Sequence, residues 1–173
     1  MDSIEQAKSE RGLIEKAVSW IPGYKGYKEK ETRRAVDKQV RDALAKKLDA
    51  RARKLTALQQ KLLASGGLLW MADMEKLVAR LRTVRDRIKT ASYGYAPFFD
   101  VTKVKEDDLD RMLQFDQELG DQLGAVDEAF NGLASAVKAN EGIGEAIEAA
   151  DETLVALGET FSRREAVIKG TAE

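Results

Sequence analysis

The chain of 173 residues is long enough to bury a core, and its composition, 43% hydrophobic and 34% charged, is typical of a folded water-soluble protein. It contains neither cysteine nor histidine, which excludes disulfides, thiolate chemistry, serine-histidine triads and zinc sites with nitrogen ligands. The net charge is −1, and no apolar stretch approaches the roughly 20 residues that span a bilayer. We therefore expect a cytoplasmic protein without a signal peptide, cofactor or bound metal.

The first predicted helix runs from about Ser3 to Ile21, where Pro22-Gly23 ends it. Its apolar residues recur at helical spacing and form one face. They are Ile4, Ala7, Ile14, Ala17, Val18 and Ile21. The other face carries mixed charges, so the sequence predicts an amphipathic N-terminal helix over residues 1–21.

A hairpin of two longer helices is predicted next. The first helix is predicted from about Lys28 to Ala64 and the second from about Leu68 to Ser92, because apolar residues recur at intervals of three and four within each segment. Ser65-Gly66-Gly67 supplies a helix stop and a tight reversal between them. We expect the next four residues, Leu68-Leu69-Trp70-Met71, to pack in the core, with an oligomer or membrane contact as the alternative. The basic hairpin therefore covers residues 28–92.

A second hairpin, over residues 106–170, is predicted from the most regular apolar pattern in the chain. Acidic residues at 106–108 favour the start of a helix, and the break at Asn140–Gly144 separates it from the last helix. The first helix of this hairpin has an unbroken heptad seam. Its members are Leu109, Met112, Asp116, Leu119, Leu123, Val126, Phe130, Leu133 and Val137. We predict an all-α fold, an elongated antiparallel helical bundle of about five helices with coiled-coil hairpins, in one domain over residues 1–173.

Charge is segregated along the chain. Lys25–Lys61 carries 13 basic and 5 acidic residues, whereas Asp100–Glu173 carries 7 basic and 18 acidic residues. One interpretation is that the basic and acidic hairpins attract each other within the bundle. The alternative is that a basic stripe contacts the phosphates of anionic lipid; nucleic acid is disfavoured because no motif for binding it is present. The stripe comprises Arg33, Arg34, Lys38, Arg41, Lys46, Lys47, Arg51, Arg53 and Lys54.

Two loops rich in tyrosine and glycine are expected to meet. One precedes the basic hairpin and the other follows it, so folding the hairpin back on itself brings both loops to the same end of the bundle. We call this cluster the loop pole. It comprises Tyr24, Lys25, Tyr27, Lys28, Arg33, Arg34, Tyr93, Tyr95, Phe98 and Phe99. The aromatic side chains either plug the open end of the bundle or form a recognition site for an anion or an extended peptide.

The same segments resemble an uncharacterised family of small helical prokaryotic proteins. The resemblance rests on Pro-Gly-Tyr-x-Gly-Tyr-Lys-x-Lys-Glu and Arg-Arg-x-x-Asp-Lys within residues 21–38, and on Tyr-Gly-Tyr-x-x-Phe-Phe-Asp within residues 91–100. A weaker match to the same family follows at residues 109–111 and 115–116. The resemblance implies no activity, but it places the two loops and Asp116 among the positions to test.

Asp116 is the one polar member of an otherwise apolar seam. A buried charge without a partner is strongly penalised, so we expect a buried ion pair with Arg33, Arg34 or Lys38 of the basic hairpin.

Together these patterns predict a non-enzymatic structural or adaptor protein whose loop pole binds a protein partner or a second copy in a homo-oligomer. The alternative is a peripheral membrane protein at the inner face of the membrane. It would bind anionic lipid through the basic hairpin and the amphipathic first helix. Tyrosine and lysine at the loop pole are the only side chains that favour an enzyme, and no catalytic residue is predicted.

Overall fold

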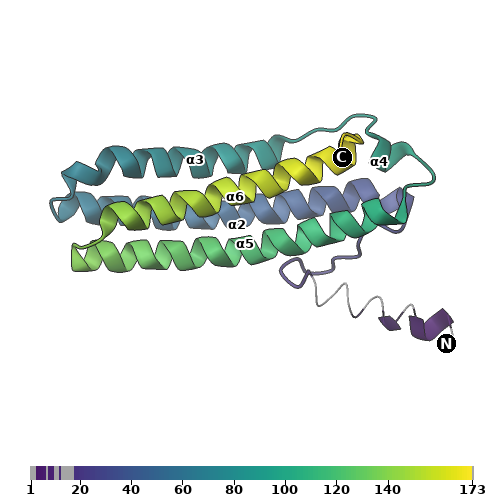
Figure 1. Cartoon of the computed structure of the whole chain (residues 1–173), viewed down its shortest axis with the longest axis horizontal. Helices are drawn as coiled ribbons and strands as arrows, with labels where there is room; N and C mark the ends of the chain where they lie inside the picture. The colour runs from purple at the N-terminus through teal and green to yellow at the C-terminus, as the bar shows by residue number, and fades with distance from the viewer. Residues whose placement is uncertain (1–2, 7, 10–11, 13–17, 173) are drawn as a thin grey trace. The chain divides into compact units, whose positions relative to one another are not determined.

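The computed structural model describes residues 3–6, 8–9, 12 and 18–172 (Figure 1). Within these residues every regular element is a helix and none is a strand, so the predicted all-α helical bundle is confirmed. None of the helices in this described part contains an apolar stretch that is long enough to cross a membrane.

The basic hairpin consists of α2 (Lys30–Ala64), the short 3-10 helix η1 (Leu68–Trp70) and α3 (Met71–Thr90). The reversal between α2 and η1 requires Gly66, whose φ of 81° is unfavourable for residues with a side chain. The backbone N–H of Gly67 then donates to the carbonyl of Leu62 at 2.9 Å, which closes the end of α2. Both predicted helices are observed and end within two residues of the predicted limits.

The acidic hairpin consists of α5 (Glu106–Ala139) and α6 (Ile143–Lys169). The reversal between them has two positive φ angles, 53° at Asn140 and 68° at Gly142. A further helix, α4 (Pro97–Asp100), lies in the segment predicted as a loop. Proline favours the first turn of a helix, because its fixed φ suits that position and its missing N–H is not needed there.

The predicted first helix falls partly outside the described residues. The members of its apolar face that lie outside them are Ala7, Ile14 and Ala17. In the described part, residues 3–6 are helical and the Ile4 side chain is 62% exposed. Val18–Trp20 forms a turn, so the prediction that the helix continues to Ile21 is wrong. Val18 and Ile21 are nevertheless buried, because the turn directs the chain back onto the helices.

The chain divides into two compact units. The loop unit comprises Met1–Ala43, Ser92–Gly120 and Thr160–Glu173, and the tip unit comprises Leu44–Ala91 and Asp121–Glu159. The boundaries fall inside α2, α5 and α6, so each unit contains segments of both predicted hairpins.

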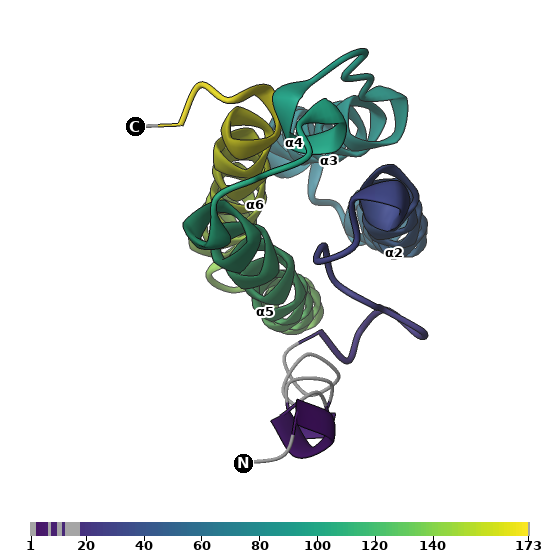
Figure 2. The same cartoon turned by 90° about the vertical axis from the view of Figure 1, so that its right-hand side faces the viewer.

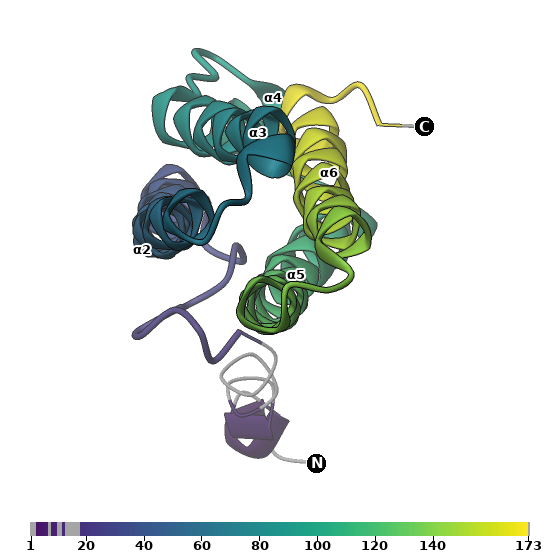
Figure 3. The ribbon, with the colours of Figure 1, turned by 90° about the vertical axis from the view of Figure 1, so that its left-hand side faces the viewer.

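In the tip unit, four helical segments surround a shared apolar interior, in the order α2, α3, α6, α5 (Figure 3). The residues of the predicted seams are buried there. On α2 and α5 they include Leu44, Leu48, Leu55, Leu62, Leu123, Val126, Phe130 and Leu133. Ion pairs at the surface join neighbouring helices: Arg85 with Asp49, Arg80 with Asp151, and Arg51 with Asp127. Two of these three pairs connect the basic hairpin to the acidic one, as the first interpretation of the charge pattern predicts.

Candidate functional site

The two tyrosine-glycine loops meet in the loop unit. The rings of Tyr27 and Phe98 lie edge to face with their centroids 5.5 Å apart, and Tyr24 packs against Tyr27 in the same way at 6.1 Å. Figure 2 looks onto this unit, where α4 lies beside the end of α6. Pro97 of α4 approaches Gly170 closely enough to contact a side chain there. The predicted juxtaposition of the loops is therefore observed.

Most aromatic side chains of the loop pole fill the interior of this unit. Those of Tyr24, Tyr27, Phe98 and Phe99 are all buried, with at most 5% of their surface exposed. Tyr95 is the opposite case, because 95% of its side chain is exposed. The geometry is that of a plug, and the aromatic surface left for recognition is reduced to Tyr95, beside the partly buried Tyr93.

The two arginines of the loop pole hold the loops together. Arg33 is buried, and its guanidinium donates to the backbone carbonyls of Tyr27 at 2.7 Å and Phe98 at 3.5 Å. Arg34 donates to the carbonyl of Gly94 at 2.7 Å and lies 4.7 Å from the ring centre of Phe99. Each arginine thus anchors the loop around residues 93–99 to the start of α2. The exposed lysines of the pole are Lys25 and Lys28.

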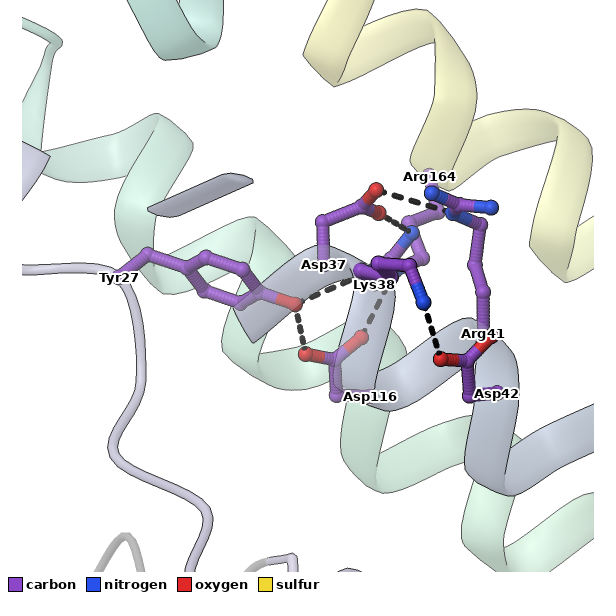
Figure 4. Close-up of polar contacts among 7 residues, drawn as sticks. All are labelled: Tyr27, Asp37, Lys38, Arg41, Asp42, Asp116 and Arg164. Atoms are coloured by element: carbon purple, nitrogen blue, oxygen red, sulfur yellow. Dashed lines mark hydrogen bonds and ion pairs between the residues drawn. The ribbon is translucent and has the colours of Figure 1, made fainter. Parts of the chain in front are cut away.

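A buried polar network lies beneath the plug, centred on Asp116 of α5 (Figure 4). The Asp116 side chain is fully buried and accepts hydrogen bonds from the hydroxyls of Tyr24, at 2.7 Å, and of Tyr27. Its other carboxylate oxygen accepts from Nε of Arg164 at 2.8 Å. The indole N–H of Trp20 donates to the backbone carbonyl of Asp116 at 2.9 Å, which fixes the turn before the first loop.

Arg164 of α6 connects Asp116 to a second buried carboxylate. Its guanidinium donates to Asp37 of α2 at 2.6 Å and to the hydroxyl of Tyr27 at 2.8 Å. The other oxygen of Asp37 pairs with Arg41 at 3.0 Å, one turn along α2. Two carboxylates and two guanidiniums therefore alternate, so that the charges in the interior balance (Figure 4).

The predicted partners of Asp116 are wrong. The guanidinium of Arg33 donates hydrogen bonds to backbone carbonyls instead. Arg34 pairs with Asp100 at 3.7 Å, and Lys38 pairs with Asp42 at 2.7 Å on the surface of α2. The partner comes from α6 instead, which belongs to the acidic hairpin.

The sequence contains a signal that identifies Arg164. The α6 seam includes Leu157, Phe161 and Ile168, and continuing its alternation of three and four residues places Arg164 on the seam between Phe161 and Ile168. The same rule places Asp37 on the α2 seam, three residues before Val40. Polar residues interrupt the apolar seams of three helices, and the fold brings these interruptions together.

Burial sets the protonation state of the phenols in the network. Desolvation raises the pKa of Tyr27 well above its ordinary value, and the negative charge of Asp116 raises it further. Desolvation also raises the pKa of Tyr24, with Tyr27 and Asp116 adding to it. For Arg164 burial acts to lower the pKa, but Tyr27, Asp116 and Asp37 outweigh it and raise the pKa. The phenols therefore remain hydrogen-bond donors and the guanidinium remains charged.

This network is suited to holding the fold together. Its carboxylate oxygens and phenols bind one another, and tyrosines with a raised pKa are poor bases and nucleophiles near neutral pH. Among the residues that the structure describes, no three acidic, histidine or cysteine side chains gather closely enough to hold a metal ion.

Large apolar side chains are exposed at the end of the tip unit. Leu63, Leu68 and Leu69 have 52%, 73% and 80% of their side chains exposed around the reversal between α2 and η1. The expectation that Leu68 and Leu69 pack in the core is therefore wrong. Trp70 accounts for the difference, because its ring packs so closely on Gly144 of α6 that a Cβ there would lie 2.9 Å away. Since the indole covers the interior at this end, the two leucines before it are left outside.

Ion pairing leaves only part of the predicted basic stripe accessible to a ligand. Arg33 is buried. Four other members pair with aspartates: Arg34 with Asp100, Lys38 with Asp42, Arg41 with Asp37, and Arg51 with Asp127. The four that have no ion-pair partner among the described residues are Lys46, Lys47, Arg53 and Lys54, all in the tip unit.

No family model matches the chain, and no match is found among curated proteins or solved structures.

Proposed function

We propose that the protein is a non-enzymatic structural or adaptor protein that presents its loop pole to a protein partner, which includes a second copy of the chain. The observation that carries this proposal is Tyr95, a large side chain with 95% of its surface exposed at the apex of the second loop. Tyrosine and arginine are enriched at protein interfaces, where a tyrosine contributes a large contact area and a polar hydroxyl.

The backbone around Tyr95 is held in place, which favours a recognition role. Gly94 has a φ of 52°, and the N–H of Ala96 donates to the carbonyl of Tyr93 at 3.0 Å to close the turn. Arg34 fixes the carbonyl of Gly94 from the side of α2. An anchor on a backbone that is already ordered loses less conformational entropy when it binds a partner.

The polar network beneath the pole supports the non-enzymatic part of the proposal. Asp116, Asp37 and Arg164 are buried and bound to one another, so their charges hold the loops in place.

A photo-crosslinking amino acid at position 95 tests the proposal. We expect it to form a defined adduct with a second copy or a partner protein. Sedimentation velocity should then show that Tyr95→Ala weakens the same association by an order of magnitude or more. The matched control is Thr102→Ala, another exposed position after the same loop, which should leave the association unchanged. A chain that stays monomeric at every concentration and forms no adduct in cells contradicts the proposal.

A second candidate function is peripheral binding to an anionic membrane. It is favoured by the exposed leucines at the end of the tip unit together with its α2 and α3 segments, Leu44–Ala91, which carry 12 basic and 4 acidic residues. Exposed apolar side chains near a positive surface are typical of proteins that insert shallowly among lipid headgroups.

Liposome flotation distinguishes the two functions. Membrane binding predicts that the chain floats with anionic vesicles at low salt and that Leu68→Ser with Leu69→Ser abolishes flotation. Tyr95→Ala should leave it unchanged. Failure to float with anionic vesicles at low salt rules out the membrane candidate and leaves the adaptor proposal untouched.

A further inference from the structure

A groove between α2 and α3 in the tip unit carries an excess of positive charge. Its volume is about 370 Å³. The lining residues that bear charge are Asp49, Arg53, Arg82 and Arg85, which leaves a net of two positive charges. Thr56 and Gln60 of α2 also line it and contribute a hydroxyl and an amide that donate hydrogen bonds.

Two of the three arginines in the groove are available to bind a ligand. Arg85 is held at 2.9 Å by Asp49 and at 2.8 Å by Asp86. Arg53 and Arg82 are exposed on facing helices, and neither has a hydrogen-bond or ion-pair partner among the described residues. A planar guanidinium presents paired N–H groups that match the oxygens of a phosphate, and two of them beside one groove form a clamp for an anion.

Two further grooves of the tip unit show how the α2–α3 groove differs from its neighbours. The groove between α3 and α6 also contains cations, Lys76 and Arg80, but three acidic residues line it and make it net negative. The groove between α2 and α5 contains Lys61 and Lys138, which are point charges beside a mainly apolar lining that includes Leu58 and Val137. Of the three grooves, only the α2–α3 groove combines arginines that have no ion-pair partner among the described residues with neutral hydrogen-bond donors.

We propose that the α2–α3 groove is a binding site for a phosphate group, clamped between Arg53 and Arg82 with Thr56 and Gln60 as additional donors. The lining contains no aromatic ring on which a base could stack, so the recognised element is the phosphate itself, as in a phosphomonoester or pyrophosphate. This chemistry is shared by free phosphorylated compounds and by lipid headgroups that end in a phosphomonoester. The site does not depend on the adaptor function proposed above, because it does not use Tyr95. It shares Arg53 and Arg82 with the basic segment of the membrane candidate, but it does not use the exposed leucines.

Titration calorimetry of the full chain with pyrophosphate at low salt tests the site. Co-sedimentation with vesicles of phosphatidylcholine alone, or with added phosphatidic acid, forms a parallel arm. We expect saturable binding by the wild type, and at least a roughly tenfold loss of affinity when Arg53→Gln is combined with Arg82→Gln. Arg53→Lys with Arg82→Lys should give an intermediate affinity, because it keeps the charges and removes the forks.

The matched control is Lys61→Gln with Lys138→Gln, which removes the same charge from the same unit but from another groove. It should change the affinity by less than about twofold. Both glutamine variants alter exposed residues, and circular dichroism verifies that they fold.

Binding of pyrophosphate that depends on the arginines supports the site with a soluble ligand. Binding only to phosphatidic acid vesicles with the same dependence supports it with a headgroup ligand. The proposal is overturned if the chain binds neither pyrophosphate nor phosphatidic acid vesicles, or if the lysine control loses as much affinity as the arginine-to-glutamine variant.

Discussion

The residues of the buried network contribute to stability in proportion to how completely they are removed from water. Arg164 neutralises Asp116 and Asp37, and all three side chains are at most 1% exposed. Removing one member of such a cluster leaves an uncompensated charge in a medium of low dielectric, which costs far more than breaking an ion pair at the surface.

Neighbouring arginines on α6 provide a direct comparison. We expect Arg164→Gln to lower the free energy of unfolding by about 3 kcal/mol or more, because two carboxylates lose their shared counterion. Arg163→Gln should cost less than about 1 kcal/mol, since Arg163 is 59% exposed where it pairs with Glu118. Urea denaturation monitored by circular dichroism measures both. Similar losses in the two variants would contradict a dominant role for the buried pair.

The buried tyrosines predict a loss of stability at alkaline pH. The pKa of Tyr27 is raised in the folded state, so its contribution is fully present below the unfolded value of 10.0 and declines as pH rises above it. Each such tyrosine adds a slope of about 1.4 kcal/mol per pH unit in this range. Urea denaturation between pH 9 and pH 11 should therefore show a shallower decline for Tyr27→Phe than for the wild type. Tyr95→Phe, at an exposed position outside the network, is the control for the loss of a hydroxyl and should change the free energy of unfolding at pH 7 by less than about 0.5 kcal/mol.

At the scale of the elements, α5 shows how tertiary contact overrides helix propensity. Gly120 and Gly124 lie one turn apart, and an added Cβ would improve the intrinsic helix propensity at both by about 1 kcal/mol. A Cβ on Gly120, however, would clash with the indole of Trp20, whereas a Cβ on Gly124 would meet nothing within 4 Å.

The two glycines therefore predict effects of opposite sign. Gly124→Ala should stabilise the protein by about 0.5 to 1 kcal/mol. Gly120→Ala should destabilise it, because Trp20 must move and its hydrogen bond to the carbonyl of Asp116 is lost. Thermal unfolding measures the sign, and tryptophan fluorescence reports the displacement of Trp20. Stabilisation by both substitutions would show that the indole does not pack on α5.

Local rules predict the helix ends and the apolar seams, but they do not predict which apolar residues at those ends are exposed. Periodicity and glycine turns predict α2, α3, α5 and α6 to within two residues at nearly every end. The same rules place Leu68 and Leu69 on the interior side of a helix start. They are exposed because Trp70, packed on Gly144 of the distant α6, already covers that interior.

At the scale of the whole chain, the net charge of −1 conceals a strong separation of basic and acidic residues along the sequence. In the tip unit, Leu44–Ala91 carries a net charge of +8 and Asp121–Glu159 carries −8, from 1 basic and 9 acidic residues. Exposed pairs such as Arg80 with Asp151 contribute roughly 0 to 1 kcal/mol each at low ionic strength, and salt screens them.

Salt should therefore lower the stability modestly. We expect the thermal midpoint to fall by a few degrees as NaCl rises from about 0.01 to 0.5 M, because attraction between the two halves is screened. Combining Arg80→Gln with Asp151→Asn should reduce this dependence. A midpoint that rises steadily over the same range would indicate that repulsion within each half outweighs attraction between them.

The sequence by itself determined the helical class, the two reversals and the meeting of the tyrosine-glycine loops. Each of these follows from a backbone period of about 3.6 residues and from the turn chemistry of glycine and proline. Only the tertiary structure decided which polar residues pair inside. Asp37 and Arg164 are 127 positions apart, and they meet because three helices pack in one particular register. Apolar seams of similar side chains tolerate several registers, whereas a buried carboxylate requires one specific guanidinium at hydrogen-bond distance.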